Sequence, residues 1–247
     1  MIKKLKSVPC ALALGVLALS GAFNAHAEIS YTATFVSDYI FEGVSQTSGD
    51  PALQGSIDYG HESGFYAGAW ASNVDFGTDA KGAEIDLYFG FIGDIGDNIG
   101  FDVGYVDYQY RGDDFDGFGF GELYASLTVM DDTSLKIWLA DDDNIGGSSS
   151  RFNLSHSLEL SDNLSLNLAY YGWKTDDAIW NTHGAKEIID GVHVTTEQGE
   201  DSYRGYQIGL STEMAGFAVD LNYSDTDMNW WTDADGRFVL SVSKSFD

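Results

Sequence analysis

The chain has 247 residues, a formal net charge of −27 and a sequence pI of about 4.1. The phosphates of a nucleic acid would repel such an acidic protein, so nucleic acid is excluded as a ligand. Beyond residue 27 no stretch approaches the roughly eighteen continuous apolar residues of a membrane helix. Any crossing of a membrane would therefore be made by the strands of a closed barrel.

Residues 1–27 have the features of a secretory signal peptide. Lys3, Lys4 and Lys6 form a basic start, residues 10–19 are an apolar run, and residues 25–27 read Ala-His-Ala, a small-x-small cleavage site. Cleavage before Glu28 would remove three lysines and no acidic residue, so the net charge would fall from −27 to −30. The predicted domains are a leader over 1–27 and one barrel over 28–247.

From Ile29 onward, stretches of about ten residues alternate between apolar and small or polar side chains, the period of a β-strand. The first stretch has one apolar face, which consists of Ile29, Tyr31, Ala33, Phe35, Tyr39 and Phe41. Similar alternation recurs along the whole chain. Residues 64–71 are ambiguous, because Phe65, Ala67 and Ala69 compete with Tyr66 and Trp70 for the apolar face.

The connections between these stretches alternate between short and long. Short turns rich in Gly, Asp, Asn and Ser are predicted at 61–64, 93–98, 130–134, 161–163 and 213–216. Long loops are predicted at 42–51, 72–82, 111–118, 141–150, 174–201 and 225–236. The pattern predicts an all-β fold, a transmembrane antiparallel up-and-down β-barrel of about 12 strands, with short periplasmic turns and long extracellular loops.

The apolar face of each strand is predicted to meet lipid, and its aromatic residues fall at two heights. Two aromatic belts are typical of a barrel that sits at both membrane interfaces. The predicted girdle consists of Tyr31, Tyr59, Phe91, Phe101, Phe217 and Phe246 near the periplasm and of Tyr39, Tyr170, Tyr206, Tyr223 and Phe238 near the outer edge. A secreted β-sandwich would also alternate, but it would not sort its rings by height.

The other face of the strands carries charged residues that are predicted to line the lumen. The candidates are Asp38, Asp58, Glu84, Asp86, Asp102, Glu122, Lys136, Glu159 and Asp220, in which Lys136 is the only clear base within a span. An acidic lumen would attract cations and repel anions. The same acids could instead hydrogen-bond to neighbouring tyrosines and fill the interior, and the pattern does not decide between the two.

The predicted loops are acidic too, at Asp113, Asp114, Asp116, at Asp141, Asp142, Asp143 and at Asp225, Asp227, Asp233, Asp235. None has the spacing of a metal site, since Trp230 stands where a calcium loop needs glycine. We therefore expect no metal and no cofactor. The 174–201 loop, with His183 and His193, could fold inward as a constriction or stay outside as a binding surface.

His156 falls among outward residues, where a lipase in the barrel wall would place its base. Such a site also needs a lipid-facing nucleophile, and Ser155 and Ser157 are predicted to point inward. No Gly-x-Ser-x-Gly, His-Glu-x-x-His or phosphate-loop motif is present. The sequence thus predicts a protein that is not an enzyme.

Residues 37–47, Ser-Asp-Tyr-Ile-Phe-Glu-Gly-Val-Ser-Gln-Thr, and 51–59, Pro-Ala-Leu-Gln-Gly-Ser-Ile-Asp-Tyr, resemble the TorF-type porin-like family of uncharacterised bacterial outer-membrane proteins. Residues 64–68, 72–76 and 84–88 extend the resemblance, which is specific over 35–93. It implies a barrel and a porin label, with no catalytic residue. The final strand, which ends at Phe246, also resembles the aromatic-ended last strand of outer-membrane proteins.

Together these features predict a passive channel in the bacterial outer membrane, exported through the periplasm, for small hydrophilic solutes and favouring cations. Its expected partners are outer-membrane lipid, lipopolysaccharide and the solutes. The alternative is a closed structural barrel whose acidic loops bind divalent cations, lipopolysaccharide or a partner protein.

Overall fold

The computed structural model describes residues 28–77, 81–112, 115, 118–142, 147–176, 185–189, 192–196, 201–228 and 231–246, of which 185–189 and 192–196 are described by their backbone alone. The predicted leader over 1–27 lies outside the described residues, as do Asp113, Asp114, Asp116, Asp143, His183 and Trp230. Among the described residues, no helix has the length and apolar character that spanning a membrane requires.

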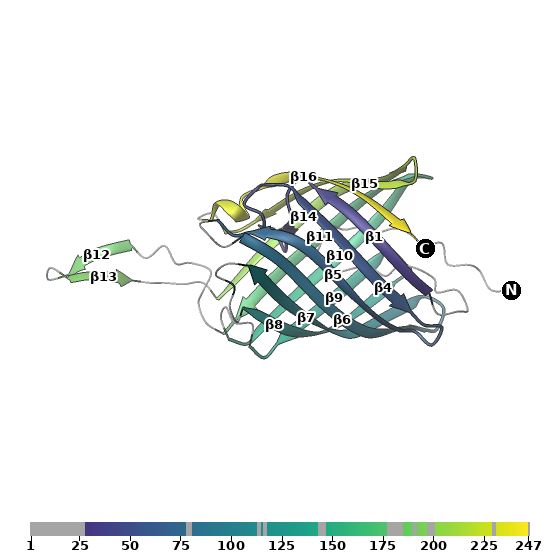
Figure 1. Ribbon diagram of the computed structural model, residues 1–247, viewed down its shortest axis with the longest axis horizontal. Helices are drawn as coiled ribbons and strands as arrows, with labels where there is room; N and C mark the ends of the chain where they lie inside the picture. The colour runs from purple at the N-terminus through teal and green to yellow at the C-terminus, as the bar shows by residue number, and fades with distance from the viewer. Residues whose placement is uncertain are drawn as a thin grey trace.

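Twelve antiparallel strands close into a single barrel, in the order β1-β16-β15-β14-β11-β10-β9-β8-β7-β6-β5-β4 (Figure 1). Their bounds are β1 (Glu28–Val36), β4 (Ala52–Gly60), β5 (Phe65–Asp75), β6 (Lys81–Ile95), β7 (Ile99–Gly112), β8 (Gly119–Val129), β9 (Thr133–Ala140), β10 (Ser149–Ser161), β11 (Leu164–Thr175), β14 (Ser202–Met214), β15 (Phe217–Thr226) and β16 (Arg237–Phe246). The predicted twelve-stranded antiparallel barrel is confirmed.

One end of the barrel carries the short turns and the C-terminus, and the other carries the long connections (Figure 1). The turns lie at 61–64, 96–98, 130–132, 162–163 and 215–216, each within a predicted turn. We call the two ends the turn end and the loop end.

The alternation in the sequence becomes an apolar outer surface and a polar interior. On β8, Leu123 is 63% exposed, whereas its neighbours Glu122 and Tyr124 are 1% and 6% exposed. The ambiguous residues 64–71 follow the same rule, because Phe65 points outward and Tyr66 is buried inside. Closure of the sheet leaves no free edge, which is the condition for backbone groups to be satisfied in lipid.

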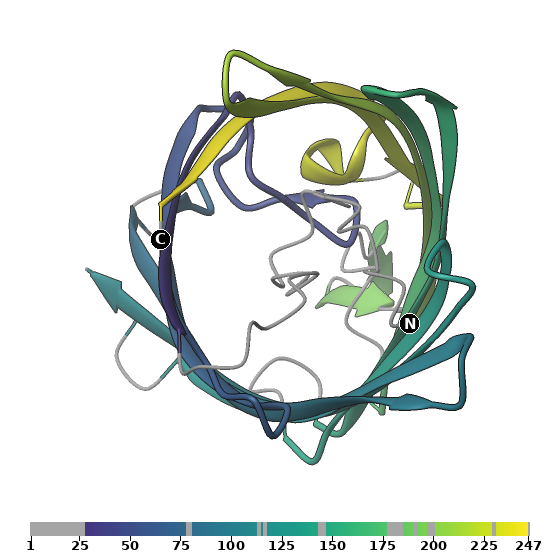
Figure 2. The same cartoon turned by 90° about the vertical axis from the view of Figure 1, so that its right-hand side faces the viewer.

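The first long connection turns into the barrel instead of extending away from it (Figure 2). Residues 37–50 form this inward hairpin, which carries the short strands β2 (Ile40–Phe41) and β3 (Val44–Ser45). The prediction that Tyr39 belongs to the outer girdle is therefore wrong, and so is the outward assignment of Phe41. Barrel strand β1 ends at Val36, and the rings of Tyr39 and Phe41 are 3% and 8% exposed.

Two other connections carry short elements. The 3-10 helix η1 (Thr232–Ala234) packs beside β3 at the loop end. Strands β12 (Ala185–Ile189) and β13 (Val192–Thr196) form a two-stranded sheet that is separate from the barrel wall. They lie in the 174–201 connection, half of which is outside the described residues.

Candidate functional site

The tip of the inward hairpin is held by one arginine of the barrel wall. Arg151 donates from Nη1 to Glu42 Oε1 at 3.0 Å and from Nε and Nη2 to the carboxylate of Glu122 at 2.5–3.1 Å. Its Nη2 also donates to the hydroxyl of Tyr108 at 2.7 Å. Arg151, Glu42 and Glu122 are each 2% exposed or less, so this is a buried ion cluster with one cation and two carboxylates.

Arg151 lies between two tryptophans because of strand register. Trp138 on β9, Arg151 on β10 and Trp173 on β11 are directly opposite one another. The guanidinium carbon is 4.0 Å from the ring centre of Trp138, 4.7 Å from that of Phe41 and 5.8 Å from that of Trp173. These cation–π contacts partly replace the water that the guanidinium loses on burial.

Sequence reasoning missed Arg151, and the prediction that Lys136 is the only base within a span is wrong. The predicted loop 141–150 ended one residue before Arg151, and the outward positions of Phe152 and Leu154 imply by alternation that Arg151 points inward. That signal was in the sequence. The partnership with Glu42 was not, because the two residues are 109 positions apart.

Glu42 occupies a backbone position that rarely accepts glutamate. It follows Phe41 and precedes Gly43 in a two-residue turn, with φ values of 45° at Glu42 and 84° at Gly43. A left-handed conformation costs a residue other than glycine roughly 1–2 kcal/mol, and Asn or Asp is the usual occupant. Glu42 lies outside the barrel strands, and burial raises its pKa to about 7, although the positive charge of Arg151 acts to lower it.

The base of the inward hairpin is held by a second cluster. Asp38 accepts hydrogen bonds from Ser45 Oγ at 2.6 Å, from Thr47 Oγ1 at 3.0 Å and from Arg237 Nη1 on β16 at 2.8 Å. Asp38 was predicted to face the lumen from the first strand. It lies inside the barrel, but on the hairpin.

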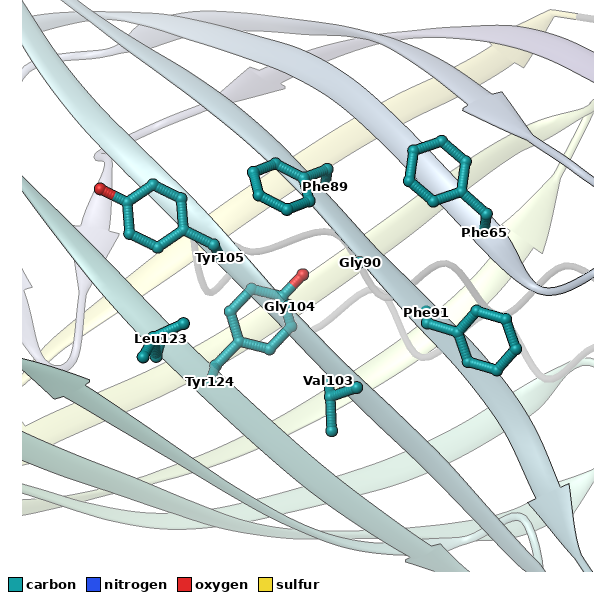
Figure 3. A pocket seen from close by; sticks show the side chains of 9 residues that line it. All are labelled: Phe65, Phe89, Gly90, Phe91, Val103, Gly104, Tyr105, Leu123 and Tyr124. Atoms are coloured by element: carbon teal, nitrogen blue, oxygen red, sulfur yellow. The ribbon is translucent and has the colours of Figure 1, made fainter.

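A different polar network lines the wall nearer the turn end, where Tyr66, Gly90, Gly104 and Tyr124 stand opposite one another on β5 to β8. Both phenol rings lie across the glycines, where a Cβ would overlap them. We call this pair the tyrosine bridge, since Tyr66 Oη and Tyr124 Oη are hydrogen-bonded to each other. A shallow groove lies on the outer side of the same wall. It is bordered by apolar residues, among them Phe89, Phe91 and Val103 (Figure 3).

Two of the predicted lumen residues, Asp102 and Lys136, contact the tyrosine bridge. Tyr66 Oη donates to Asp102 Oδ1 at 2.5 Å, and Lys136 Nζ lies 3.4 Å from Asp102 Oδ2 and 3.8 Å from the ring centre of Tyr124. The side chains of Asp102 and Lys136 are 23% and 15% exposed, in contrast to the 1% of Arg151 and Glu42. This part of the interior therefore stays in contact with water.

The remaining lumen candidates have other partners, and two of them, Glu84 and Asp86, lie close enough to feel the charge of Arg151. Asp58 accepts hydrogen bonds from Tyr88 Oη and from Ser56 Oγ, and Asp220 accepts one from Ser211 Oγ. Glu84 and Asp86 are buried inward on β6, each 2% exposed. Glu159 is exposed near the turn end of β10, beside a register shift.

The predicted girdle residues other than Tyr39 lie on the outer surface. Tyr31 and Phe246 are paired across β1 and β16, and Tyr170 and Tyr206 are paired across β11 and β14. The remaining members are half-buried or exposed, namely Tyr59, Phe91, Phe101, Phe217, Tyr223 and Phe238. The ring centres of Tyr223 and Phe238 are 5.0 Å apart.

Polar side chains of the outer surface gather at the loop end and at one turn. On β7, Asp107 Oδ2 accepts a hydrogen bond from Gln109 Nε2, and Gln109 Oε1 accepts one from Arg111 Nη2, each at 2.6 Å. His156 Nδ1 lies 2.9 Å from Thr133 Oγ1 and 3.9 Å from Asp132 Oδ1. Within the described part of the chain, no three His, Cys, Asp or Glu side chains are grouped closely enough to hold a metal ion.

Solved structures with a similar fold are outer-membrane porins and channels. The NanC porin matches with a TM-score of 0.53 at 9% identity, over 89% of this chain and 100% of that one. The KdgM porin matches with 0.51 at 8% identity, over 90% and 99%. An outer-membrane channel from Pseudomonas putida F1 matches with 0.52 at 12% identity, over 91% and 97%. At such identities the similarity shows the fold.

A comparison with curated protein sequences finds no significant match. A family model does match the sequence, over residues 21–246, which is nearly the whole chain. Its description is "Bacterial protein of unknown function (Gcw_chp)", and the narrower TorF-type name receives no separate support. The chain belongs to the Gcw_chp family of bacterial proteins.

Proposed function

We propose that this protein is a passive channel of the bacterial outer membrane for small hydrophilic solutes, with a preference for cations. The observation that carries the proposal is the closed barrel with an apolar exterior and a charged, hydrogen-bonded interior. A soluble protein has no reason to expose so many large apolar side chains, among them Leu53, Leu123 and Phe238 at 63–71%. The porin-like fold and the TorF-type resemblance give further support.

The preference for cations follows from the charges on the inner wall. The barrel strands carry six inward carboxylates, Asp58, Glu84, Asp86, Asp102, Glu122 and Asp220, against three inward bases, Lys136, Arg151 and Arg237. An excess of carboxylates in a narrow wall lowers the energy of a cation and raises that of an anion. One fold relative, KdgM, was solved with oligogalacturonate, an acidic oligosaccharide. The charge balance here argues against such an anion as the solute of this chain.

The proposed orientation places the turn end in the periplasm, after export with the leader 1–27 removed. The loop end then faces outward, where the outer leaflet holds lipopolysaccharide. Basic side chains on the outer surface there are suited to its phosphates: Lys81, Arg111, Lys174 and Arg204. Lys174 and Arg204 lie just beyond the paired rings of Tyr170 and Tyr206, at the level where headgroups begin.

Two matched variants test the preference for cations in a planar bilayer with a salt gradient. Asp102→Asn removes an inward charge, and Asp107→Asn makes the same change on the outer side of the same strand. We expect a reversal potential of cation-selective sign, reduced by Asp102→Asn and unchanged by Asp107→Asn. An anion-selective sign, or equal effects of the two variants, would contradict the proposal.

A second candidate is a closed structural barrel that binds lipopolysaccharide or a partner at the loop end. The specific observation in its favour is the burial of the inward hairpin against the wall, since Thr47 of the hairpin and Tyr171 of β11 beside it are 0% exposed. This candidate predicts negligible conductance in every variant, and it predicts that calcium protects the loops from protease. An enzyme is not proposed, because Thr133 Oγ1 and Asp132 Oδ1 both lie on the Nδ1 side of His156. A catalytic triad needs the nucleophile and the orienting carboxylate on different nitrogens of the histidine ring.

A further inference from the structure

The inward hairpin lies inside the barrel near the loop end (Figure 2). From this one segment, Tyr39 packs on Trp70 of β5, and Phe41 packs on Tyr108 of β7 and Trp173 of β11. Its other contacts reach Arg151 on β10, Tyr203 on β14 and Arg237 on β16. A hairpin that touches so much of the barrel circumference stands across the path of a solute.

We propose that the inward hairpin is a gate, which closes the lumen while its tip is docked on Arg151 and must leave the lumen for solutes to pass. The inference rests on the proposed channel function and adds the regulation of that channel. Arg151 acts as a positioning residue, because it holds the tip through Glu42 and the wall through Glu122.

The barrel does not need the hairpin for its own closure. Strands β1 and β4 pair directly along their whole length, and their last pair at the loop end is Val36 opposite Ala52. The hairpin is inserted between these two positions. It can therefore move without breaking a barrel strand.

The hairpin is attached mostly through side chains. Among the described backbone hydrogen bonds, Asp75 N to Gln46 O at 2.8 Å joins it to the wall, and Ser37 N to Leu240 O at 2.9 Å anchors its first residue. Its tip depends on the ion cluster at Arg151. Buried ion pairs contribute little net stability, because desolvation offsets their attraction, so the ion cluster alone does not lock the tip in place.

Release of the hairpin would also change the charge of the wall. The surface beneath it includes Glu84, Asp86 and Glu122, with Arg151 as their basic neighbour. The uncovered wall is therefore acidic. Opening and preference for cations would thus arise from the same region of the barrel.

The test compares four proteins refolded into the same detergent and then inserted in planar bilayers. They are the native sequence, a variant in which residues 37–51 are replaced by Asn-Gly, Arg151→Gln and Lys136→Gln. Asn-Gly favours the two-residue turn that the pairing of Val36 with Ala52 allows. Lys136→Gln is the matched control, since it removes one inward positive charge whose contacts are with Asp102, Tyr124 and Trp138 and not with the hairpin.

We expect the fraction of time that the channel is open to be lowest for the native protein and for Lys136→Gln, because Lys136→Gln changes the charge of the path but not the docking of the hairpin. The deletion should raise it by about tenfold or more, because loss of the plug leaves the path permanently open. Arg151→Gln leaves two carboxylates without their cation, which should shift the docking equilibrium by on the order of a hundredfold. Far-UV circular dichroism and heat-modifiable migration in gels verify that each barrel is folded.

Equal conductance in the native protein and the folded deletion variant would overturn the gate and leave the channel in place. Absence of conductance in all the folded proteins, the deletion variant included, would overturn the channel and the gate together. If Arg151→Gln does not fold, the deletion alone decides, because it retains Arg151 paired with Glu122.

Discussion

The two ends of the lumen are built from the same residue types but differ in their access to water. Near the loop end, Arg151 and its carboxylates are almost completely buried under the inward hairpin. Nearer the turn end, Asp102 and Lys136 stay partly exposed beside the tyrosine bridge. The two clusters differ in exposure because different parts of the chain cover them. A hairpin covers the first cluster, whereas Gly90 and Gly104 let the rings of the second lie flat against the wall.

This contrast separates a charge that holds structure from one that can meet a solute. A buried cation with two carboxylates is costly to disturb, because removal of one partner leaves the others without compensation. The pair Asp102–Lys136, which keeps 15–23% of its side-chain surface in water, is partly screened and contributes less to stability. Substitutions at the loop end should therefore affect folding and gating, and those near the turn end should affect selectivity.

The largest effect is expected from removal of the arginine. Arg151→Met keeps an apolar stem between Trp138 and Trp173 but leaves Glu42 and Glu122 buried without a cation. The free energy of unfolding should fall by about 3–5 kcal/mol. Lys136→Met should cost much less, since the Lys136 side chain is 15% exposed. Denaturant unfolding in detergent micelles measures both, and equal losses would contradict the contrast.

A smaller effect is expected at the tyrosine bridge. In Gly104→Ala the new methyl group would overlap the ring of Tyr124, so stability should fall by about 1–3 kcal/mol. Gly100→Ala on the same strand is the control, because the nearest atom to its Cβ would be 3.9 Å away. The thermal midpoint should drop in the first variant and stay unchanged in the second. A drop of the same size in both would mean that glycine is needed for reasons other than the ring.

The smallest effect is a dependence of docking on pH. The pKa of Glu42 is about 7 when the hairpin is docked, above its ordinary value of 4.5, so between these values the docked state holds more protons than the released one. Docking should weaken as pH rises through this window, and conductance should increase from about pH 5 to about pH 8. The groups that face Glu42 are Arg151, Glu122, Tyr171 and Tyr203.

Glu42→Gln provides the control for this dependence, because glutamine resembles the protonated acid. The variant should stay docked at both pH values and lose the component of the pH response that belongs to Glu42. An unchanged response in Glu42→Gln would assign the effect to other carboxylates of the lumen.

Much of the barrel could be predicted from the sequence, because apolar residues at every second position show directly which face of a strand lies on the outer surface of the barrel. The alternation around Leu123 and Tyr124 and the turn at 61–64 are local signals of this kind. The inward course of residues 37–50 could not be predicted in this way. Tyr39 and Phe41 continue the outward series of β1 in sequence, and only contacts with distant strands turn them inside.

The pairings inside the lumen were beyond the sequence for a related reason. Asp58, Asp102 and Asp220 could be assigned to the interior from alternation, yet their partners depend on barrel closure and strand register. Tyr66 and Asp102 are 36 positions apart, and Arg237 and Asp38 are 199 positions apart. A one-residue shift in register would separate such pairs, so local patterns cannot specify them.

The most direct test of the account is the reversal potential of the barrel without its hairpin, in an about tenfold gradient of potassium chloride. We expect a stable conductance through a water-filled path and a potential of cation-selective sign, set by the acidic wall that the hairpin covers in the native chain. A folded, inserted barrel that passes no current, or one that favours chloride, would contradict it.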